Sequence, residues 1–426
     1  MDKYVIDGSF PLKGRVKASG NKNAALPCLA ATLLTDETVL LSNIPDIEDV
    51  QVMIDILKAL GSSVESKAPG VYSITTSDIS SSEIPLDLAR SIRASLLFAG
   101  PLLARTGKVI LPPPGGDVIG RRRLDTHFLA LQTLGARIEA DGLFKITANK
   151  LVGDEIFLDE ASVTATENAI MAACLAEGAT RIENAASEPH IQDLCRLLNA
   201  MGAQIAGIGS NILVIDGVKS LHGTEYRIGS DYMEVGSFIG LAAVTRGDLE
   251  IEDACPAQLK MTKLAYGKLG IHWEQEGNSI RVSSGLQLRV IPDMGGMIPK
   301  IDDAPWPGFP PDLVSIMLVV ATQVEGTVLI HEKMFESRMF FVDKLIGMGA
   351  RIILCDPHRA VVSGPSRLRG SDLVSPDVRA GMAMVIAALC AEGQSRIQNV
   401  YQIERGYEKF VERLQGLGAR IKRVAQ

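Results

Sequence analysis

A repeated segment constrains the fold of this chain more than any single motif does. Six times a helix-like stretch ends in Leu-Gly or Met-Gly and gives way to a strand-like stretch, at intervals of roughly 70 residues. The glycines that mark the six copies are Gly61, Gly135, Gly202, Gly270, Gly349 and Gly418. A shared period of this length indicates six copies of one supersecondary unit.

A second turn precedes each of these glycines by about 25 residues, where an apolar helix-like stretch gives way to a β-branched run. The turn residues are Asp36, Gly107, Gly178, Gly247, Gly326 and Gly393. Glycine just past a helix can adopt the left-handed conformation that closes the last turn. Each copy is therefore predicted to contain two helices that alternate with short strands, which places the chain in the α/β class.

The most apolar segments indicate where the helices lie. Residues 94–104 (ASLLFAGPLLA) and 382–391 (MAMVIAALCA) are apolar nearly all round, as expected of helices that are buried on every side. We therefore expect helices inside and sheets outside, the reverse of a TIM barrel. Three copies fill about 200 residues, a normal domain size. The sequence predicts two domains of three copies each, residues 21–229 and residues 1–20 together with 230–426, with a boundary near Gly229.

Composition excludes several broad classes of protein. Hydrophobic residues make up 46% and charged residues 22%, which supplies packed cores and argues against disorder. The longest apolar run, residues 315–324, is about half as long as a membrane-spanning helix, and the N-terminus lacks signal-peptide features. We expect a soluble cytoplasmic protein without a membrane partner. The 50 acidic and 43 basic residues give a net charge of −7, which disfavours a nucleic-acid partner.

The sequence lacks motifs for metals and nucleotide cofactors. The six cysteines form no C-x-x-C pair, and the six histidines form no H-E-x-x-H pattern. No G-x-G-x-x-G follows a strand-like run, and the P-loop pattern is absent. We therefore expect no metal and no cofactor, and core positions for Cys28, Cys174 and Cys390.

Two segments interrupt the repeat with residues that suit anion binding. SGNKNAALP places Lys22 and Asn23 at the start of a helix, where an ammonium group and backbone N–H groups can hold a phosphate. The alternative is a solvated surface lysine. LPPPGGDVIGRRRLDTH, residues 111–127, places Asp117 beside arginines 121–123 in a proline- and glycine-rich loop. The alternative here is a solvated charge run.

Two further features are an isolated aspartate and a set of arginines. Asp312 follows two prolines at a predicted helix start, where an aspartate most often only caps the helix. Arginines predicted to follow strands occupy related places in the repeat and suggest a shared cationic cleft. They are Arg93, Arg338, Arg379 and Arg405. Each alone is also compatible with a surface ion pair of modest strength.

Together these segments resemble the enolpyruvyl transferases. The resemblance rests on SGNKNAALP, PGGDVIGRRRLDTH, FPPDL, MFESRMF, DVRAG and IERGYE, in this order along essentially the whole chain. It implies an inside-out α/β barrel of six units in two similar domains that close over a cleft, with a mobile catalytic loop at residues 111–123. It also implies transfer of the enolpyruvyl group of phosphoenolpyruvate to the 3-hydroxyl of UDP-N-acetylglucosamine. Phosphate is released through a tetrahedral intermediate, in the first committed step of peptidoglycan synthesis.

The resemblance also implies roles for individual residues. Lys22, Asn23, Arg122 and Arg405 match positions that bind phosphoenolpyruvate. The positions that match the UDP-sugar site are Asn23, Arg93, Arg122, Arg123, Leu124, Asp125, Thr126, Ser162, Val163, Thr164, Asp312 and Met334. Arg338, Asp377 and Arg379 match a supporting cationic cleft. Lys22, Asp117 and Asp312 are the expected catalytic residues, with Asp312 taking the proton of the sugar hydroxyl.

Three positions depart from the pattern of the family. Asp117 stands where most members carry a cysteine general acid, and some carry aspartate. Because fosfomycin alkylates that cysteine, the resemblance predicts that this protein resists the drug. Glu160 stands where several relatives have lysine, and Tyr232 replaces a common arginine.

Three alternatives to this function stay open at the level of sequence. A related transferase acting on another alcohol, such as shikimate 3-phosphate, would share most of these segments. A non-catalytic paralogue that binds the sugar nucleotide is supported only by Glu160 and Tyr232. A repeat-built scaffold is disfavoured because Lys22, Asp117, Arg122, Asp312 and Arg405 occur together.

Overall fold

Helices on the inside and sheets on the outside characterise each half of the chain. The structure is a computed structural model, and it describes residues 2–116 and 123–425. The chain divides into two units, one of residues 20–116 and 123–229 and the other of residues 2–19 and 230–425. Each unit has a hydrophobic core of its own. This arrangement confirms the predicted inside-out α/β class.

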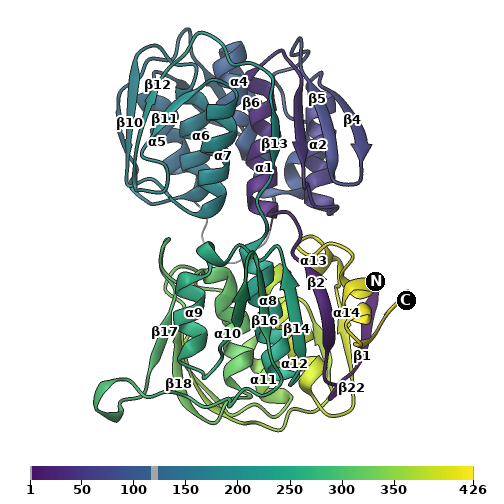
Figure 1. Cartoon of the computed structure of the whole chain (residues 1–426). Helices are drawn as coiled ribbons and strands as arrows, with labels where there is room; N and C mark the ends of the chain where they lie inside the picture. The colour runs from purple at the N-terminus through teal and green to yellow at the C-terminus, as the bar shows by residue number, and fades with distance from the viewer. Residues whose placement is uncertain (1, 117–122, 426) are drawn as a thin grey trace. The chain divides into compact units, whose positions relative to one another are not determined.

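The inner helices of the two units are almost entirely buried. Those of residues 20–229 are α1 (Lys22–Ala31), α4 (Ala99–Thr106), which continues the 3-10 helix η2 (Arg93–Phe98), and α6 (Val163–Ala173). Those of residues 230–425 are α8 (Tyr232–Val244), α10 (Val314–Ala321) and α12 (Val378–Cys390). Figure 1 shows strands around these helices in each unit. Every residue of α8 and α10 is buried, as their apolar composition requires.

A second helix in each copy is amphipathic and buries one face. In order these helices are α2 (Glu48–Ala59), α5 (Asp125–Thr133), α7 (Pro189–Ala200), α9 (Lys260–Gly267), α11 (Val342–Gly347) and α14 (Phe410–Gly416). Short additional helices are α3 (Leu86–Ser91) and α13 (Tyr401–Glu404). Among the described residues, no helix combines the length and the apolar character that crossing a membrane requires.

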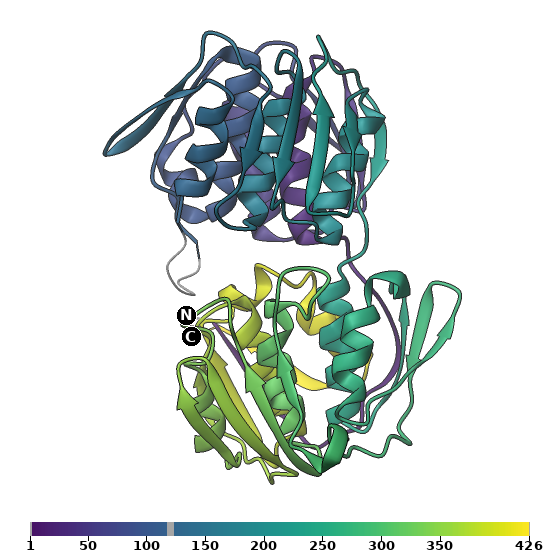
Figure 2. The ribbon, with the colours of Figure 1, turned by 90° about the vertical axis from the view of Figure 1, so that its left-hand side faces the viewer.

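The described residues form six sheets, three in each unit (Figure 2). In the unit of residues 20–229 they are β13(Glu225–Arg227)-β3(Val39–Ser42)-β5(Val71–Thr75)-β4(Ser63–Ala68), β6(Lys108–Leu111)-β8(Leu143–Thr147)-β7(Arg137–Asp141) and β11(Gln204–Ala206)-β12(Ile212–Asp216)-β10(Ala179–Glu183)-β9(Glu155–Phe157). In the other unit they are β15(Glu274–Glu276)-β16(Ser279–Val282)-β14(Asp248–Glu252)-β2(Lys13–Lys17), β17(Lys300–Asp302)-β18(Gly326–His331)-β20(Arg359–Gly364)-β19(Ile352–Asp356) and β21(Asp372–Val374)-β22(Gln394–Gln398)-β1(Lys3–Asp7)-β23(Arg420–Val424).

The strand pairing explains why the N-terminus belongs with the C-terminal half. In the copies built around α6, α10 and α12, the strand before the helix pairs in parallel with the strand after it. In the copies of α1 and α8 the leading strands are exchanged. β2 precedes α1 but pairs with β14, and β13 precedes α8 but pairs with β3. The chain therefore passes from one unit to the other near residues 19–20 and again near residues 229–230.

The repeat glycines occupy backbone conformations that other residues rarely adopt. All six Leu/Met-Gly glycines have positive φ, from 72° at Gly270 to 108° at Gly61. This explains their recurrence, because a Cβ atom disfavours that region. The second set of turns obeys the rule less strictly. At the fourth copy Arg246, with φ of 52°, takes the left-handed position that we expected of Gly247.

Candidate active site

Lys22 is the first residue of α1 and is held by a buried carboxylate. Asn21 caps the helix, because its side-chain oxygen accepts the backbone N–H groups of Asn23 and Ala24. Lys22 Nζ lies 2.6 Å from Asp49 Oδ2, and the two side chains are 14% and 5% exposed. Lys22 is therefore not a solvated surface lysine. It presents a largely desolvated ammonium group beside the start of a helix, a combination that favours anions.

Pro27 interrupts the hydrogen bonding of the first turns of α1. It lies inside the helix and has no N–H to donate to the carbonyl of Asn23, four residues earlier. At its start, the helix carries the ammonium group of Lys22 and the amide side chain of Asn23 on consecutive residues.

Arg93 and Arg123 belong to one hydrogen-bonded group. Arg93 Nη2 donates to the carbonyl oxygen of Arg123 at 3.1 Å. Arg123 Nε donates to Asp125 Oδ2 at 3.2 Å, and its Nη2 lies 3.1 Å from Asp159 Oδ2. Asp159 Oδ1 accepts the hydroxyl proton of Thr126 at 2.8 Å. Arg123 and Asp159 are both 40% exposed, so these ion pairs are weak and a phosphate can compete for Arg123.

The segment of Ser162, Val163 and Thr164 lies where α6 begins. Ser162 is the residue before the helix and makes no capping hydrogen bond through its side chain. His127 Nδ1 accepts Asn168 Nδ2 at 3.0 Å, so His127 Nε2 donates to Thr164 Oγ1, also at 3.0 Å. This network fixes α5 against the beginning of α6, whose backbone N–H groups suit an acceptor-rich ligand.

In the other unit, Asp312 lies between two buried arginines. It belongs to the 3-10 helix η5 (Pro311–Leu313), and its side chain caps no helix. Arg338 Nη2 donates to Asp312 Oδ1 at 2.6 Å, and Arg379 Nε donates to Oδ2 at 3.0 Å. Arg379 also donates to the hydroxyl of Tyr407 at 3.1 Å. The simple capping role is therefore wrong, and Asp312 joins η5, the segment after β18 and the first turn of α12.

The two arginines decide the ionisation of Asp312. Burial alone would raise its pKa, but the guanidinium groups of Arg338 and Arg379 outweigh burial and hold the pKa below the ordinary value. Asp312 is therefore ionised at neutral pH and, in this arrangement, a weak base.

The other predicted residues of this unit are Asp377, Met334 and Arg405, and each has different surroundings. Asp377 caps α12 by accepting the backbone N–H of Arg379 at 2.8 Å, which fixes the start of the helix that carries this arginine. Met334 is 37% exposed. Arg405 directly follows α13, is 6% exposed and donates to Gln402 Oε1 at 3.1 Å.

The arginines follow strands at three of the four positions. Arg338, Arg379 and Arg405 lie five to seven residues after the ends of β18, β21 and β22, whereas Arg93 begins η2 after the helix α3. Arg338, Arg379 and Arg405 are also 5–6% exposed, which rules out surface ion pairs. Asp117 and Arg122, like Arg121, lie outside the described residues.

Reasoning from sequence missed the partners that hold these groups. Asp49, Asp159 and Tyr407 are absent from the predicted set, although each contacts a member of it. Asp49 lies in an acidic first helical turn, a pattern that usually reflects only the helix dipole. No motif distinguishes it before the helices are packed.

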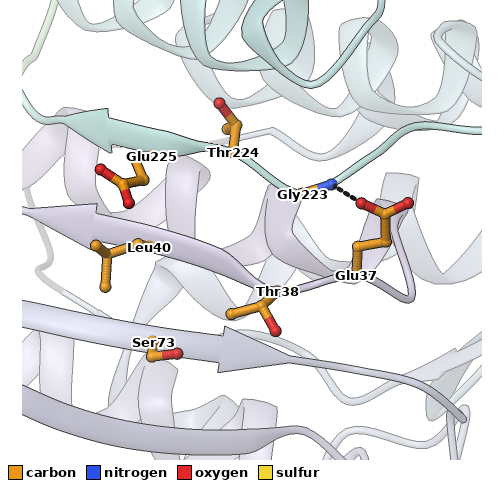
Figure 3. Close-up of a pocket in the computed structure, with 7 residues that line it drawn as sticks. All are labelled: Glu37, Thr38, Leu40, Ser73, Gly223, Thr224 and Glu225. Carbon is orange, nitrogen blue, oxygen red and sulfur yellow. Dashed lines mark hydrogen bonds between the residues drawn. The ribbon is translucent and has the colours of Figure 1, made fainter.

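A shallow pocket of about 520 Å³ on an outer sheet has a different character (Figure 3). It lies along β3, β5 and β13, and its lining includes Glu37, Ser73, Gly223 and Glu225. Glu37 Oε2 accepts the backbone N–H of Gly223 at 2.9 Å. Because carboxylates and no arginine or lysine line the pocket, it is unsuited to phosphate-bearing ligands.

Known proteins resemble this chain in sequence over nearly its whole length. The chain is 68% identical to the UDP-N-acetylglucosamine 1-carboxyvinyltransferase of Treponema denticola over 422 residues, 99% of each chain. It is 66% identical to the protein of the same name from Treponema pallidum, again over 99% of each chain.

Solved structures show the same fold. The enolpyruvyl transferase NikO from Streptomyces tendae is 24% identical, and the alignment covers 100% of this chain and 99% of that one with a TM-score of 0.88. An EPSP synthase from Acinetobacter baumannii is 18% identical, with a TM-score of 0.78 and full coverage of both chains. Residues 6–414 match the sequence profile of the EPSP synthase (3-phosphoshikimate 1-carboxyvinyltransferase) family. The chain therefore belongs to this family of enolpyruvyl transferases.

Proposed function

We propose that this protein transfers the enolpyruvyl group of phosphoenolpyruvate to the 3-hydroxyl of UDP-N-acetylglucosamine and releases phosphate. The observation that carries the proposal is the 68% identity to an enzyme with that name over 99% of both chains. This reaction is the first committed step of peptidoglycan synthesis. The two substrates are both anionic, and the chain, with a net charge of −7, must therefore bind them with locally cationic groups.

The charges of the groups described above fit these demands. Lys22 and the first turn of α1 suit the phosphate of phosphoenolpyruvate, with Arg122 and Arg405 as further cationic partners. Arg93, the segment 123–126 and the start of α6 suit the nucleotide, because exposed ion pairs there can yield to a diphosphate. Met334 and Asp312 are assigned to the sugar.

Asp312 is the candidate acceptor for the proton of the sugar hydroxyl. Its lowered pKa makes it a weak base while Arg338 and Arg379 are both engaged. A phosphate group that attracts one of these arginines would remove a positive charge from Asp312 and raise its pKa. Base strength would then appear only when the anionic substrate is bound, which ties proton removal to substrate binding.

Asp117 is the candidate general acid that delivers a proton to C3 of phosphoenolpyruvate while the sugar oxygen attacks C2. An unperturbed aspartate has a pKa of about 3.9, so keeping it protonated at pH 7 costs roughly 4 kcal/mol. Desolvation and a neighbouring phosphate dianion both favour the protonated form. We therefore expect the acid form chiefly in the substrate-loaded enzyme.

The identity of the acceptor is tested by comparing initial rates of phosphate release. Phosphoenolpyruvate is supplied alone, with UDP-N-acetylglucosamine, or with shikimate 3-phosphate. The proposal expects release only with the sugar nucleotide. Faster release with shikimate 3-phosphate would favour the activity in the family's name, and binding of the sugar nucleotide without any release would indicate a non-catalytic paralogue.

A further inference from the structure

Two buried carboxyl groups lie side by side at the ends of two parallel strands. β17 and β18 pair in register up to Asp302 and His331, so the next residues, Asp303 and Glu332, occupy neighbouring positions. Both are 0% exposed, and a hydrogen bond can form between the two side chains only when one of them carries a proton. None of the residues assigned above to substrate binding or catalysis is part of this pair.

The pair binds the beginning of the segment that leads to Arg338. Asp303 Oδ1 accepts the backbone N–H of Lys333 at 2.5 Å. Glu332 Oε1 accepts those of Met334 and Phe335 at 3.2 and 3.1 Å. Three consecutive N–H groups are therefore satisfied by two side chains. Arg338, three residues further on, packs its guanidinium carbon 5.0 Å from the centre of the Phe335 ring and donates to Asp312.

The two remaining oxygens have no donor among the described residues. These atoms are Asp303 Oδ2 and Glu332 Oε2. Two ionised carboxylates that face each other out of water repel strongly, and one proton between them removes the repulsion. In keeping with this, burial and the hydrogen bond and charge of Asp303 raise the pKa of Glu332 to about 9.

The charged groups around the pair do not replace this proton. Arg338 is the cation that acts on Glu332 and opposes the rise of its pKa, but its guanidinium is hydrogen-bonded to Asp312 instead. The ammonium of Lys333 turns to Asp302 at 2.9 Å, as does that of Lys300. His358 lies in the turn between β19 and β20. Its Nδ1 donates to the backbone oxygen of Glu332 at 2.8 Å and not to the carboxyl group of Glu332.

We propose that Asp303 and Glu332 share one proton and act as positioning residues, which hold the segment 333–338 so that Met334 and Arg338 face the sugar nucleotide. This inference rests on the proposed function for its ligand and on the structure alone for the shared proton. Loss of the proton places a second negative charge near Arg338. The ionised pair then competes with Asp312 for the guanidinium group of Arg338 and loosens the segment 333–338. Nucleotide-sugar binding should therefore weaken at alkaline pH.

Glu332→Gln tests the shared proton without removing the hydrogen bonds. The glutamine oxygen can accept the N–H groups of Met334 and Phe335, while its amide donates permanently to Asp303 Oδ2. In the wild type, Glu332 keeps its proton to about pH 9, whereas the unfolded chain loses it near pH 4.5. Wild-type stability should therefore fall, relative to the variant, as pH rises from about 4.5 to about 9. The difference in melting temperature between variant and wild type should grow across this range.

Asp303→Asn provides a second variant if the first folds poorly. Its amide can donate to Glu332 Oε2 in the same way, so each single variant should fold. The double variant should lose more stability than the sum of the losses in the two single variants, because two amide NH2 groups would face each other.

Asp302→Asn is the matched control one residue away. Burial alone would raise the pKa of Asp302, but Lys333 and Lys300 outweigh it and lower the pKa. The control should therefore change the pH dependence only in the acid range.

Two readouts separate this inference from the proposed function. An infrared carbonyl band of protonated carboxylic acids at pH 7, weaker in Glu332→Gln than in the wild type, needs no substrate. Parallel pH–stability curves for the two proteins, or a band of equal intensity in both, would overturn the shared proton. For binding, the KM for UDP-N-acetylglucosamine should rise above about pH 9 in the wild type and stay flat in Glu332→Gln. An identical rise in both proteins would overturn the positioning role.

Discussion

Lys22 and Asp49 illustrate how a charged residue is kept in place where little water reaches it. Removing one member of a largely buried ion pair leaves the other charge uncompensated, at a cost of about 3 kcal/mol. Asp49→Asn should therefore lower the free energy of unfolding by about that amount and raise the KM for phosphoenolpyruvate, because Lys22 loses its fixed position. Urea unfolding and steady-state kinetics measure the two effects. The exposed Asp46 offers a control, and equal losses in Asp46→Asn and Asp49→Asn would refute this role.

The aspartate at position 117 leads us to expect that fosfomycin, a covalent inhibitor, does not inactivate this protein. The family resemblance implies that fosfomycin acts by alkylating a cysteine thiolate at this position, and a carboxylate there is a far weaker nucleophile. We expect no time-dependent inactivation of the wild type, and a gain of inactivation in Asp117→Cys. Mass spectrometry of the intact chain detects the adduct. A fosfomycin adduct on residue 117 of the wild type would show that the reasoning is wrong.

At the level of single elements, two glycines near the C-terminus allow the effect of backbone conformation on stability to be measured apart from steric clashes. Gly418 has φ of 93° and Gly416 ends helix α14 without positive φ, and an added Cβ would meet no atom within 4 Å at either position. Gly418→Ala should therefore destabilise the protein by about 1 kcal/mol through strain alone. Gly416→Ala should be neutral or stabilising by up to about 1 kcal/mol. Thermal unfolding of both variants checks this, and a stabilising Gly418→Ala would contradict the conformational reading of the repeat.

The elements that sequence predicted well are those set by local rules. The start of α1 at Lys22, the buried character of α12 and the repeat glycines follow from caps, apolar periodicity and φ preference, all of which act within a few residues. The stretch 94–104 was harder, since it begins as the 3-10 helix η2 and only then becomes α4. Local apolar pattern does not distinguish these two helix types.

The sequence predicted individual residues of the candidate site but not the contacts between them. Arg379 and Asp312 are 67 residues apart, and Asp303 and Glu332 directly follow two different strands. Such pairs exist only after the helices and sheets have packed, so no spacing rule reveals them. The family resemblance identified Asp312, Arg338 and Arg379 as functional candidates, whereas the lowered pKa that they produce together required the structure.

On the scale of the whole molecule, each unit has its own core, and both tryptophans, Trp273 and Trp306, belong to the unit of residues 230–425. Leu102 and Leu318 are fully buried in different cores. Replacing either by alanine should cost about 2–5 kcal/mol. Leu318→Ala should shift the unfolding transition seen by tryptophan fluorescence. Leu102→Ala should shift circular dichroism but leave fluorescence nearly unchanged. Equal shifts of both signals in both variants would mean that the units unfold as one.

The most direct measurement on the whole enzyme is the balance of reactants and products. Purified protein is mixed with phosphoenolpyruvate and UDP-N-acetylglucosamine, phosphate is counted, and the nucleotide product is analysed by mass spectrometry and NMR. We predict one phosphate for each sugar nucleotide consumed and an enolpyruvyl ether on the 3-oxygen, with no release from an acceptor that lacks the 3-hydroxyl and none from Asp117→Asn. Folded wild-type protein that binds the sugar nucleotide but forms no such ether would contradict the central claim.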